Sequence, residues 1–161
     1  FNVNDESLLP PVVCRDVFEG LKEPEYTKDI SQMYYSRAKY RGKRLQGQNE
    51  INIDGLGPTI RSEHHGNIEY RRLSTEHGGA NVEELSQGLP ERRLTPRECA
   101  LIQTFPPDYP CVFNKESGKG FAVSSSGAYK VIGNAVPPML AYNIAYRIQK
   151  IWDLYFGHDG N

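Results

Sequence analysis

The clearest hydrophobic pattern in the chain lies near its C-terminus, after Pro137 and Pro138. Apolar residues there recur with a helical period and predict one continuous face of a long helix: Leu140, Ala141, Ile144, Ala145, Ile148, Ile151, Trp152 and Tyr155. Proline is favoured at the first position of a helix, so the pair marks the helix start. A face this wide must be covered by a large surface, and no run of parallel-sheet strands in the sequence provides one.

A second helix is predicted over residues 95–105. Thr95 suits the N-cap, and Pro96 suits the first helical position. Glu98 lies three residues after the cap, where its carboxylate can accept from the N–H of the cap residue in a capping box. Pro106 follows the helix, and proline ends a helix because it lacks an N–H and its ring crowds the preceding turn.

Three arginines surround the start of this second helix. Arg92 and Arg93 precede the cap, and Arg97 lies in the first turn. The helix dipole favours negative charge at this end, so the arginines need partners. Either carboxylates elsewhere in the fold or a phosphate group would satisfy them.

Two shorter helices are predicted from local signals. Apolar residues at positions 13, 17 and 21 have the spacing of a short amphipathic helix. Ser124, Ser125 and Ser126 can cap another helix, which runs through Tyr129 and Val131 and stops at Gly133. Gly133 and Asn134 favour a left-handed turn at that point, because both residue types tolerate a positive φ.

Alternation of apolar and polar residues predicts several short strands. Segments 51–53 and 59–60 show it on either side of a turn at Asp54 and Gly55, and a further strand is predicted within 68–73. Segment 74–90 is rich in glycine and acidic residues, so we expect a surface connection there.

Composition narrows the classes of protein to consider. The chain has 161 residues, of which 38% are hydrophobic, a net charge of −1 and a mean hydropathy of −0.61. These values allow one domain with a thin core and exclude a globally basic nucleic-acid binder, so a DNA hypothesis depends on local charge. No apolar run reaches the roughly 18 residues of a membrane helix, so we expect no membrane association.

Cysteine usage favours a reducing compartment. Cys14, Cys99 and Cys111 have no CxxC spacing and an odd count, which is typical of free thiols. No signal-peptide pattern opens the chain, so we expect an intracellular, cytoplasmic location. The first residue is Phe1 rather than methionine, which indicates a fragment or a processed piece.

Local positive charge is concentrated between residues 36 and 48. No acid interrupts the basic residues Arg37, Lys39, Arg41, Lys43 and Arg44. Amide side chains, which can read base edges, follow at Gln46, Gln48 and Asn49. Such a loop can follow a phosphate backbone, but a solvated surface loop has the same composition.

A polar loop between two predicted strands contains Arg61, Ser62, Glu63, His64, His65 and Asn67. A zinc site there would need further ligands, and adjacent histidines of a strand point in opposite directions, so no metal site is expected. A His-Asn nuclease could use His65 and Asn67, but no second catalytic element is identifiable. A loop that reads nucleic acid is the best functional interpretation, and a plain polar hairpin loop is the alternative.

Pro110 and Cys111 have the order of a Pro-Cys nucleophile. No histidine or basic cluster lies near them in the sequence to activate the thiol. An inert cysteine is therefore the better interpretation.

Residues 92–106 read RRLTPRECALIQTFP, and residues 129–138 read YKVIGNAVPP. In order, spacing and identity these stretches resemble the last two conserved blocks of the DNA (cytosine-5) methyltransferases. More weakly, 59–60 resembles the Thr-aliphatic pair of that family's target recognition domain, and 45–51 resembles its first recognition loop. The resemblance covers about residues 36–155.

The resemblance implies a role for each block. The first would brace the recognition domain, with structural ion-pair and capping residues at Arg93, Thr95, Arg97 and Glu98. The second would return to the domain that binds S-adenosyl-L-methionine (AdoMet), and its turn would contact the methionine part of the cofactor through Asn134, Ala135 and Val136. The long apolar helix would pack on the sheet of that domain.

The resemblance also implies contacts with double-stranded DNA. Thr59 would touch the phosphate beside a flipped cytosine, and two polar loops would read flanking bases from the major groove. The expected DNA-binding residues are Lys39, Arg41, Lys43, Arg44, Gln46, Gln48, Asn49, Thr59, Ile60, Arg61, Ser62, Glu63, His64 and His65.

The family's catalytic blocks are missing from this sequence. They comprise a Pro-Cys nucleophile, a Glu-Asn-Val block, an arginine pair and a Gly-rich AdoMet turn. Pro110 and Cys111 lie on the wrong side of the recognition blocks and lack the usual following Gln. We therefore expect no catalytic residue in this chain and an N-terminal catalytic half, in cis or as a separate subunit.

These expectations define an α+β fold class. Residues 1–35 would be a linker and short helix, 36–110 a small mixed recognition domain with short strands and long loops, and 111–161 a returning segment. The C-terminal helix would pack on a Rossmann-like AdoMet-dependent methyltransferase domain missing from the chain. The expected function is the recognition portion of a restriction-modification methyltransferase; the alternatives are a stand-alone DNA-binding module and the nuclease.

Overall fold

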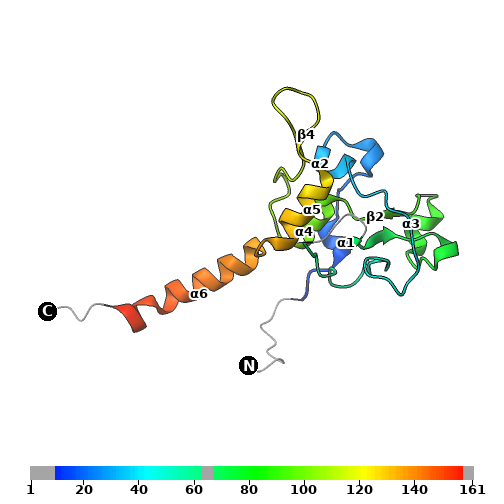
Figure 1. Cartoon of the computed structure of the whole chain (residues 1–161). Coiled ribbons are helices and arrows are strands. Elements are labelled where there is room, and N and C mark those ends of the chain that lie inside the picture. The colour runs from blue at the N-terminus through cyan, green and yellow to red at the C-terminus, as the bar shows by residue number, and fades with distance from the viewer. Residues whose placement is uncertain (1–9, 63–66, 158–161) are drawn as a thin grey trace.

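The structure, a computed structural model, describes residues 10–62 and 67–157. It consists of a body of short helices and strands, from which the long helix α6 (Pro138–Phe156) projects (Figure 1). The body is a small mixed unit with short strands and long irregular segments, as the sequence predicts. The C-terminal helix is also present as predicted.

Three short elements open the described chain: helix α1 (Cys14–Val17), the 3-10 helix η1 (Pro24–Tyr26) and helix α2 (Ile30–Met33). The first predicted helix is therefore only about one turn long. Its start is tied to another segment, because the N–H groups of Cys14 and Arg15 donate to the carbonyls of Gly55 and Ile53 at 2.9 and 2.8 Å. This contact places the predicted turn at 54–55 beside α1.

Two small antiparallel sheets are formed: β1 (Tyr70–Arg72) pairs with β2 (Arg92–Arg93), and β3 (Phe113–Asn114) pairs with β4 (Phe121–Val123). Strand β1 confirms the strand predicted within 68–73. The strands predicted at 51–53 and 59–60 are wrong, since residues 51–60 are irregular and a single bridge joins Glu50 to Tyr70. The apolar residues there serve the core from irregular backbone, with Ile51 and Ile60 buried.

The connection between β1 and β2 carries the 3-10 helix η3 (Thr75–His77) and helix α3 (Val82–Ser86). The side chains of Ser74 and Asn81 cap these helices by accepting from the N–H groups of His77 and Glu84. Segment 74–90 is thus more ordered than a plain surface connection.

Helices α4 (Pro96–Ile102) and α5 (Ser125–Asn134) pack against each other in the body (Figure 1). Ser124 caps α5 as predicted. On α5, the buried hydroxyl of Tyr129 donates to the Leu94 carbonyl at 2.7 Å and accepts from the Ser36 N–H at 3.1 Å. One side chain therefore joins three segments that are distant in the sequence.

Helix α5 continues through Gly133 to Asn134, so the predicted left-handed turn at these residues is wrong. Gly133 instead allows another segment of the backbone to lie very close to α5. The backbone of Arg61 and Ser62 lies against Gly133, where an added Cβ would overlap the Arg61 carbonyl carbon. Contact with a segment 72 positions away thus explains this residue better than local turn geometry does.

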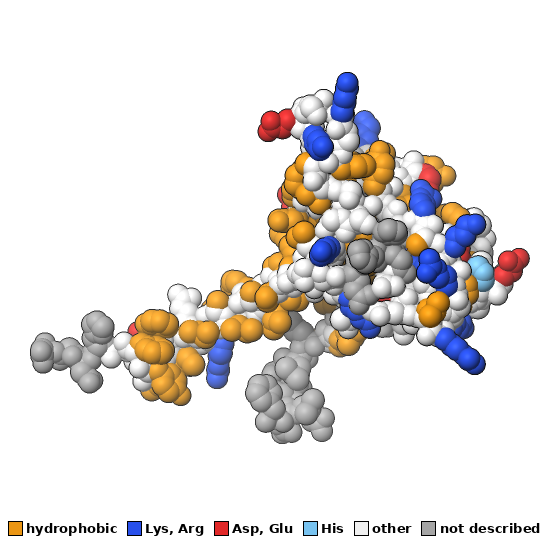
Figure 2. Space-filling model, viewed as in Figure 1, with side chains coloured by type: hydrophobic (Ala, Val, Ile, Leu, Met, Phe, Trp, Pro, Cys, Tyr) orange, Lys and Arg blue, Asp and Glu red, His pale blue; other side chains and the backbone are white. Residues whose placement is uncertain are grey.

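Helix α6 begins at Pro138 as predicted, and none of its residues is buried. Its first turn is capped from outside the helix, because Thr104 Oγ1 accepts from the Met139 N–H at 3.0 Å. Figure 2 shows hydrophobic side chains along its length. Among the helices in the described part of the chain, none is long and apolar enough to cross a membrane.

Candidate nucleic-acid interface and cofactor-side turn

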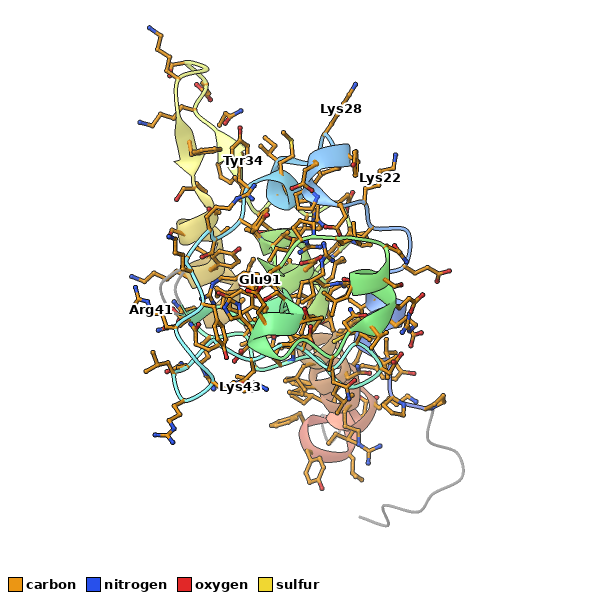
Figure 3. The ribbon with its side chains drawn as sticks, turned by 90° about the vertical axis from the view of Figure 1, so that its right-hand side faces the viewer. Lys22, Lys28, Tyr34, Arg41, Lys43 and Glu91 are labelled. Carbon is orange, nitrogen blue, oxygen red and sulfur yellow. The ribbon has the colours of Figure 1, made fainter. Side chains whose placement is uncertain are left out.

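The basic segment, defined as residues 37–44, lies on the surface of the body. All five of its basic side chains are exposed: Arg37, Lys39, Arg41, Lys43 and Arg44. Figure 3 shows Arg41 and Lys43 in a region of the ribbon away from Lys22 and Lys28. In Figure 2, lysine and arginine side chains gather on the body rather than along α6. A chain of nearly zero net charge thus presents a local positive surface suited to phosphates.

Arg93 holds the basic segment from inside the body. It is 1% exposed, and its guanidinium donates to the carbonyl oxygens of Ala38 at 2.9 Å, Gly47 at 2.6 Å and Ile68. The ring of Tyr70 lies 4.2 Å from the guanidinium carbon. The ion pair predicted for Arg93 is therefore replaced by carbonyl contacts, because loop backbone rather than carboxylates surrounds the side chain. Those contacts fix the path of the basic segment relative to β1.

Two of the predicted DNA-binding residues are buried. Gln48 is 2% exposed, and its Oε1 accepts from the Arg41 N–H at 2.8 Å. Ile60 is 9% exposed and belongs to the hydrophobic core. These positions correct the prediction, since a buried amide or methyl group cannot reach a base edge. Gln48 shapes the basic segment, and Ile60 anchors the segment that carries Thr59.

Other predicted DNA-binding residues do lie at the surface: Gln46, Asn49, Thr59 and Arg61 are exposed, and Ser62 is half-buried. Glu63, His64 and His65 lie outside the described residues. The backbone of Gly47 approaches Asn67 so closely that an added Cβ would overlap it. The structure therefore brings the end of the polar loop against Gly47, three residues after the basic segment.

The brace, defined as residues 92–98, contains the predicted capping box at the start of α4. Thr95 Oγ1 accepts from the Glu98 N–H at 3.0 Å, and Glu98 Oε2 accepts from the Thr95 N–H at 2.9 Å. Arg97 donates to the Asp29 carboxylate at 2.6 Å and to the Tyr109 carbonyl at 2.7 Å. A carboxylate within the fold, not a phosphate, thus neutralises Arg97.

A buried ion-pair network joins the brace to Glu23, Arg72 and Glu84. Arg92 contacts Glu98 and Glu23, each at 2.8 Å, and Arg72 contacts Glu23 and Glu84. Burial alone would raise the pKa of Glu23, but Arg92 and Arg72 outweigh it and lower the pKa to about 2. Burial likewise opposes the charged form of Glu98, yet Arg92 lowers its pKa. Mutual neutralisation therefore keeps these carboxylates ionised inside the body.

Sequence reasoning missed three residues that organise the site: Arg72, Glu23 and Gly133. The excess of arginine at the start of α4 was a signal that partners exist. It could not identify them, because Glu23 lies 49 residues from Arg72 and 69 from Arg92. No local signal pointed to the contact of Gly133.

The cofactor-side turn, defined as residues 134–136, connects α5 to α6. Asn134 ends α5, Ala135 takes an extended conformation, and Asn134 and Val136 are exposed. The adjoining end of α5 is held by Gln103, whose Nε2 donates to the Ile132 carbonyl at 3.3 Å. The turn therefore presents an amide and an apolar side chain from a fixed backbone.

Cys111 has the environment of a structural residue. It is 6% exposed, and burial raises the pKa of its thiol, which disfavours the reactive thiolate. Its backbone N–H donates to Ser31 Oγ at 3.1 Å. Within residues 10–62 and 67–157, no group of three or more histidine, cysteine or acidic side chains is placed to hold a metal ion.

The chain belongs to the C-5 cytosine-specific DNA methylases, because the sequence pattern of that family matches residues 12–150. The match contains the basic segment, the brace, the cofactor-side turn and most of α6. It confirms the resemblance seen in the two sequence blocks.

Three relatives are Type II methyltransferases. The chain is 40% identical over 77 residues to M.NgoPII of Neisseria gonorrhoeae, covering 47% of this chain and 20% of that protein. It is 46% identical over 59 residues to M.FnuDI of Fusobacterium nucleatum, covering 37% and 14%. It is 43% identical over 61 residues to M.MthTI of Methanothermobacter thermautotrophicus, covering 38% and 16%. The matches thus span a fifth or less of each relative's length.

Proposed function

We propose that this chain is the DNA-recognition and cofactor-side portion of a DNA (cytosine-5) methyltransferase of the restriction-modification type. The complete enzyme transfers a methyl group from AdoMet to C5 of a cytosine flipped out of a specific duplex. An N-terminal catalytic half, in cis or as a separate subunit, supplies the nucleophile. Because its substrate is the DNA of a prokaryotic cell, the proposed location is the cytoplasm.

The family match over residues 12–150 carries this proposal. The matched stretch contains the two sequence blocks for which recognition and cofactor-side roles are proposed. Its one Pro-Cys pair ends in Cys111, whose thiol is buried and whose backbone N–H donates to Ser31 Oγ. A role in recognition rather than in the bond-forming step therefore suits the residues present.

DNA contact is proposed for the exposed part of the predicted set. The basic segment would follow the phosphate backbone, and Thr59 would touch the phosphate beside the flipped cytosine. The amides of Gln46 and Asn49 would read base edges. Arg61 and Ser62, with Glu63, His64 and His65, would supply the second reading loop.

AdoMet contact is proposed for Asn134, Ala135 and Val136. The methionine part of AdoMet carries a carboxylate and an ammonium group. The exposed Asn134 amide can donate to the first and accept from the second, so the chemistry of the turn fits this ligand. AdoMet supplies the methyl group when bound, and the proposed task of the turn is to hold the methionine end in place.

Helix α6 is proposed to dock on the Rossmann-like domain of the catalytic half. Leu140, Ile144, Ile148 and Trp152 follow one another at four-residue intervals and are each about half exposed. Such spacing places them on one side of the helix, where a sheet or helix layer can bury them together. Docking there would also bring the cofactor-side turn to the AdoMet site.

Reconstitution tests the proposed function. The purified chain is mixed with the catalytic half of a homologous enzyme, and methyl transfer from labelled AdoMet to duplex DNA is measured. Activity should appear in the mixture and exceed that of either half alone. Unchanged activity relative to the catalytic half alone would count against the proposal, and heat-denatured chain serves as the control.

A mobility-shift titration of the isolated chain tests the alternatives. We expect weak binding that falls steeply with salt, because phosphate contacts release counterions. Tight, sequence-specific binding by the chain alone would instead support a stand-alone DNA-binding module. Metal-dependent cleavage that is lost in His65→Ala would support the nuclease, and its absence removes that alternative.

A further inference from the structure

Gly133 joins two parts of the molecule to which different tasks are proposed. It lies in the last turn of α5, directly before the cofactor-side turn. Its backbone rests on the Arg61–Ser62 peptide, which closely follows Thr59 in the sequence. An added Cβ would overlap three backbone atoms of that peptide: the Arg61 carbonyl carbon and oxygen and the Ser62 nitrogen. Backbone, unlike a flexible side chain, cannot swing aside.

A second glycine in the same helix shows that this fit is local. A Cβ at Gly127 would lie 3.5 Å from Val123 Cγ1 and 3.9 Å from Ser124 Oγ, both ordinary van der Waals distances. Alanine raises helix propensity at both positions. Only at Gly133 does the extra methyl group force the recognition segment and α5 apart.

The cofactor-side turn is otherwise fixed to the end of α4. Gln103 holds the Ile132 carbonyl on one side of the turn, and Thr104 holds the Met139 N–H on the other. Thr104 has a φ of 63°, which a β-branched residue adopts only when its surroundings impose it. With both ends held, a displacement of Arg61 reaches the turn through Gly133, because packed interiors transmit strain.

We infer that Gly133 is a positioning residue that couples DNA recognition to AdoMet binding. DNA contacts that fix the Thr59–Ser62 backbone also fix the end of α5, and with it Asn134 and its neighbours. Coupling of this kind is reciprocal, so bound AdoMet tightens DNA binding by the same factor. The inference rests on the proposed function, because it requires both ligands to bind the assembled enzyme.

The test uses the chain assembled with the catalytic half. Mapping the methylated sites first establishes activity and identifies the target duplex. The affinity for S-adenosyl-L-homocysteine, a non-reactive analogue, is then measured by calorimetry with and without that duplex. The ratio of the two affinities is the coupling factor, for which about 5- to 150-fold is typical. We expect Gly133→Ala to reduce the ratio to about one, whereas Gly127→Ala retains the wild-type ratio.

Each outcome bears on the inference. A methylating enzyme whose ratio is unchanged in Gly133→Ala, or already one in the wild type, overturns the inference and leaves the proposed function intact. Absence of methyl transfer in the wild type removes both. If Gly133→Ala does not fold, Gln103→Leu takes its place, because it loosens the end of α5 without adding an atom beside Arg61. A ratio that is lowered in Gln103→Leu supports the inference, and an unchanged ratio overturns it.

Discussion

The brace and α6 distribute charge and apolar surface in opposite ways. Arg92 and Glu98 are 3% and 1% exposed, although charged residues normally face water. In α6, Ile144 and Trp152 are each 51% exposed, although such residues normally form cores. The brace thus has its charges neutralised inside the body, while the apolar side chains of α6 find no cover among the described residues.

This contrast assigns different tasks to the two regions. Buried ion pairs stabilise a fold only when every partner is present and the partners keep one specific geometry. An apolar helix face binds through area and is much less demanding of geometry. Substitutions in the brace should therefore alter folding, and substitutions on α6 should alter association.

The largest expected effect follows from removing Arg92. Arg92→Ala leaves Glu23 and Glu98 buried without their shared cation, so the free energy of unfolding should fall by about 3–5 kcal/mol. Urea denaturation measures it. The control is Arg15→Ala, which removes exposed ion pairs to Asp54 and Glu83 and should cost much less, because water screens such pairs. Equal losses in the two variants would contradict the distinction between buried and exposed pairs.

A smaller loss is expected from Arg97→Ala. The variant removes hydrogen bonds to Asp29 and to the Tyr109 carbonyl, worth about 1.5–3 kcal/mol of unfolding free energy. Thermal denaturation and methyl transfer per folded complex are measured together, and the second should be unchanged. A variant that folds normally but loses methyl transfer would show that Arg97 serves the reaction rather than the fold.

Acid should weaken the body through the same ion-pair network. The pKa of Glu23 is about 2 in the fold and 4.5 as its ordinary value, so its contribution is complete above about pH 4.5 and is lost as the pH falls toward 2. The pKa values of Glu84 and Glu98 are also lowered, which acts in the same direction. Urea midpoints measured between pH 6 and 2 should decline over this window. Glu23→Gln should flatten the decline, and an identical profile in the variant would exclude Glu23 as a cause.

The smallest change in stability is expected on α6, where the effect on association is large. Ile148→Glu should alter the unfolding free energy of the isolated chain by no more than about 0.5 kcal/mol, because the side chain is already exposed. It should weaken binding to the catalytic half at least about tenfold, since a carboxylate would be buried there. Gln149→Glu adds the same charge at the neighbouring position and is the control. A stability loss without an effect on assembly would reverse the roles of the two regions.

The sequence predicted the start of α4 correctly because its signals are local, whereas the helix ends at Ile102 rather than at the predicted residue 105. The cap of Thr95 and the carboxylate of Glu98 act within three residues, and the proline at position 96 needs no distant partner. The same locality explains the correct starts of α5 and α6.

Elsewhere the prediction failed where tertiary contacts decide. Apolar residues at 51–60 alternate as in a strand, yet they reach the core from irregular backbone. The carbonyls of Ile53 and Gly55 in this segment accept hydrogen bonds from the start of α1. Gly133 is followed by an asparagine, a pair that favours a left-handed turn. Its close packing against Arg61, however, is determined by the tertiary fold. For the candidate site, charge pattern identified the exposed basic segment, whereas the burial of Gln48 depends on a loop path that no local rule supplies.

The hydrogen bonds of Tyr129 bear on the order in which the chain can fold during synthesis. Its hydroxyl bonds to segments 93 and 35 residues earlier, so these contacts cannot form until the ribosome has made α5. Contacts of such sequence separation form late and slowly. The recognition segments therefore remain incompletely packed while most of the chain is translated. Helix α6 is synthesised next, so its apolar face emerges while the body is closing.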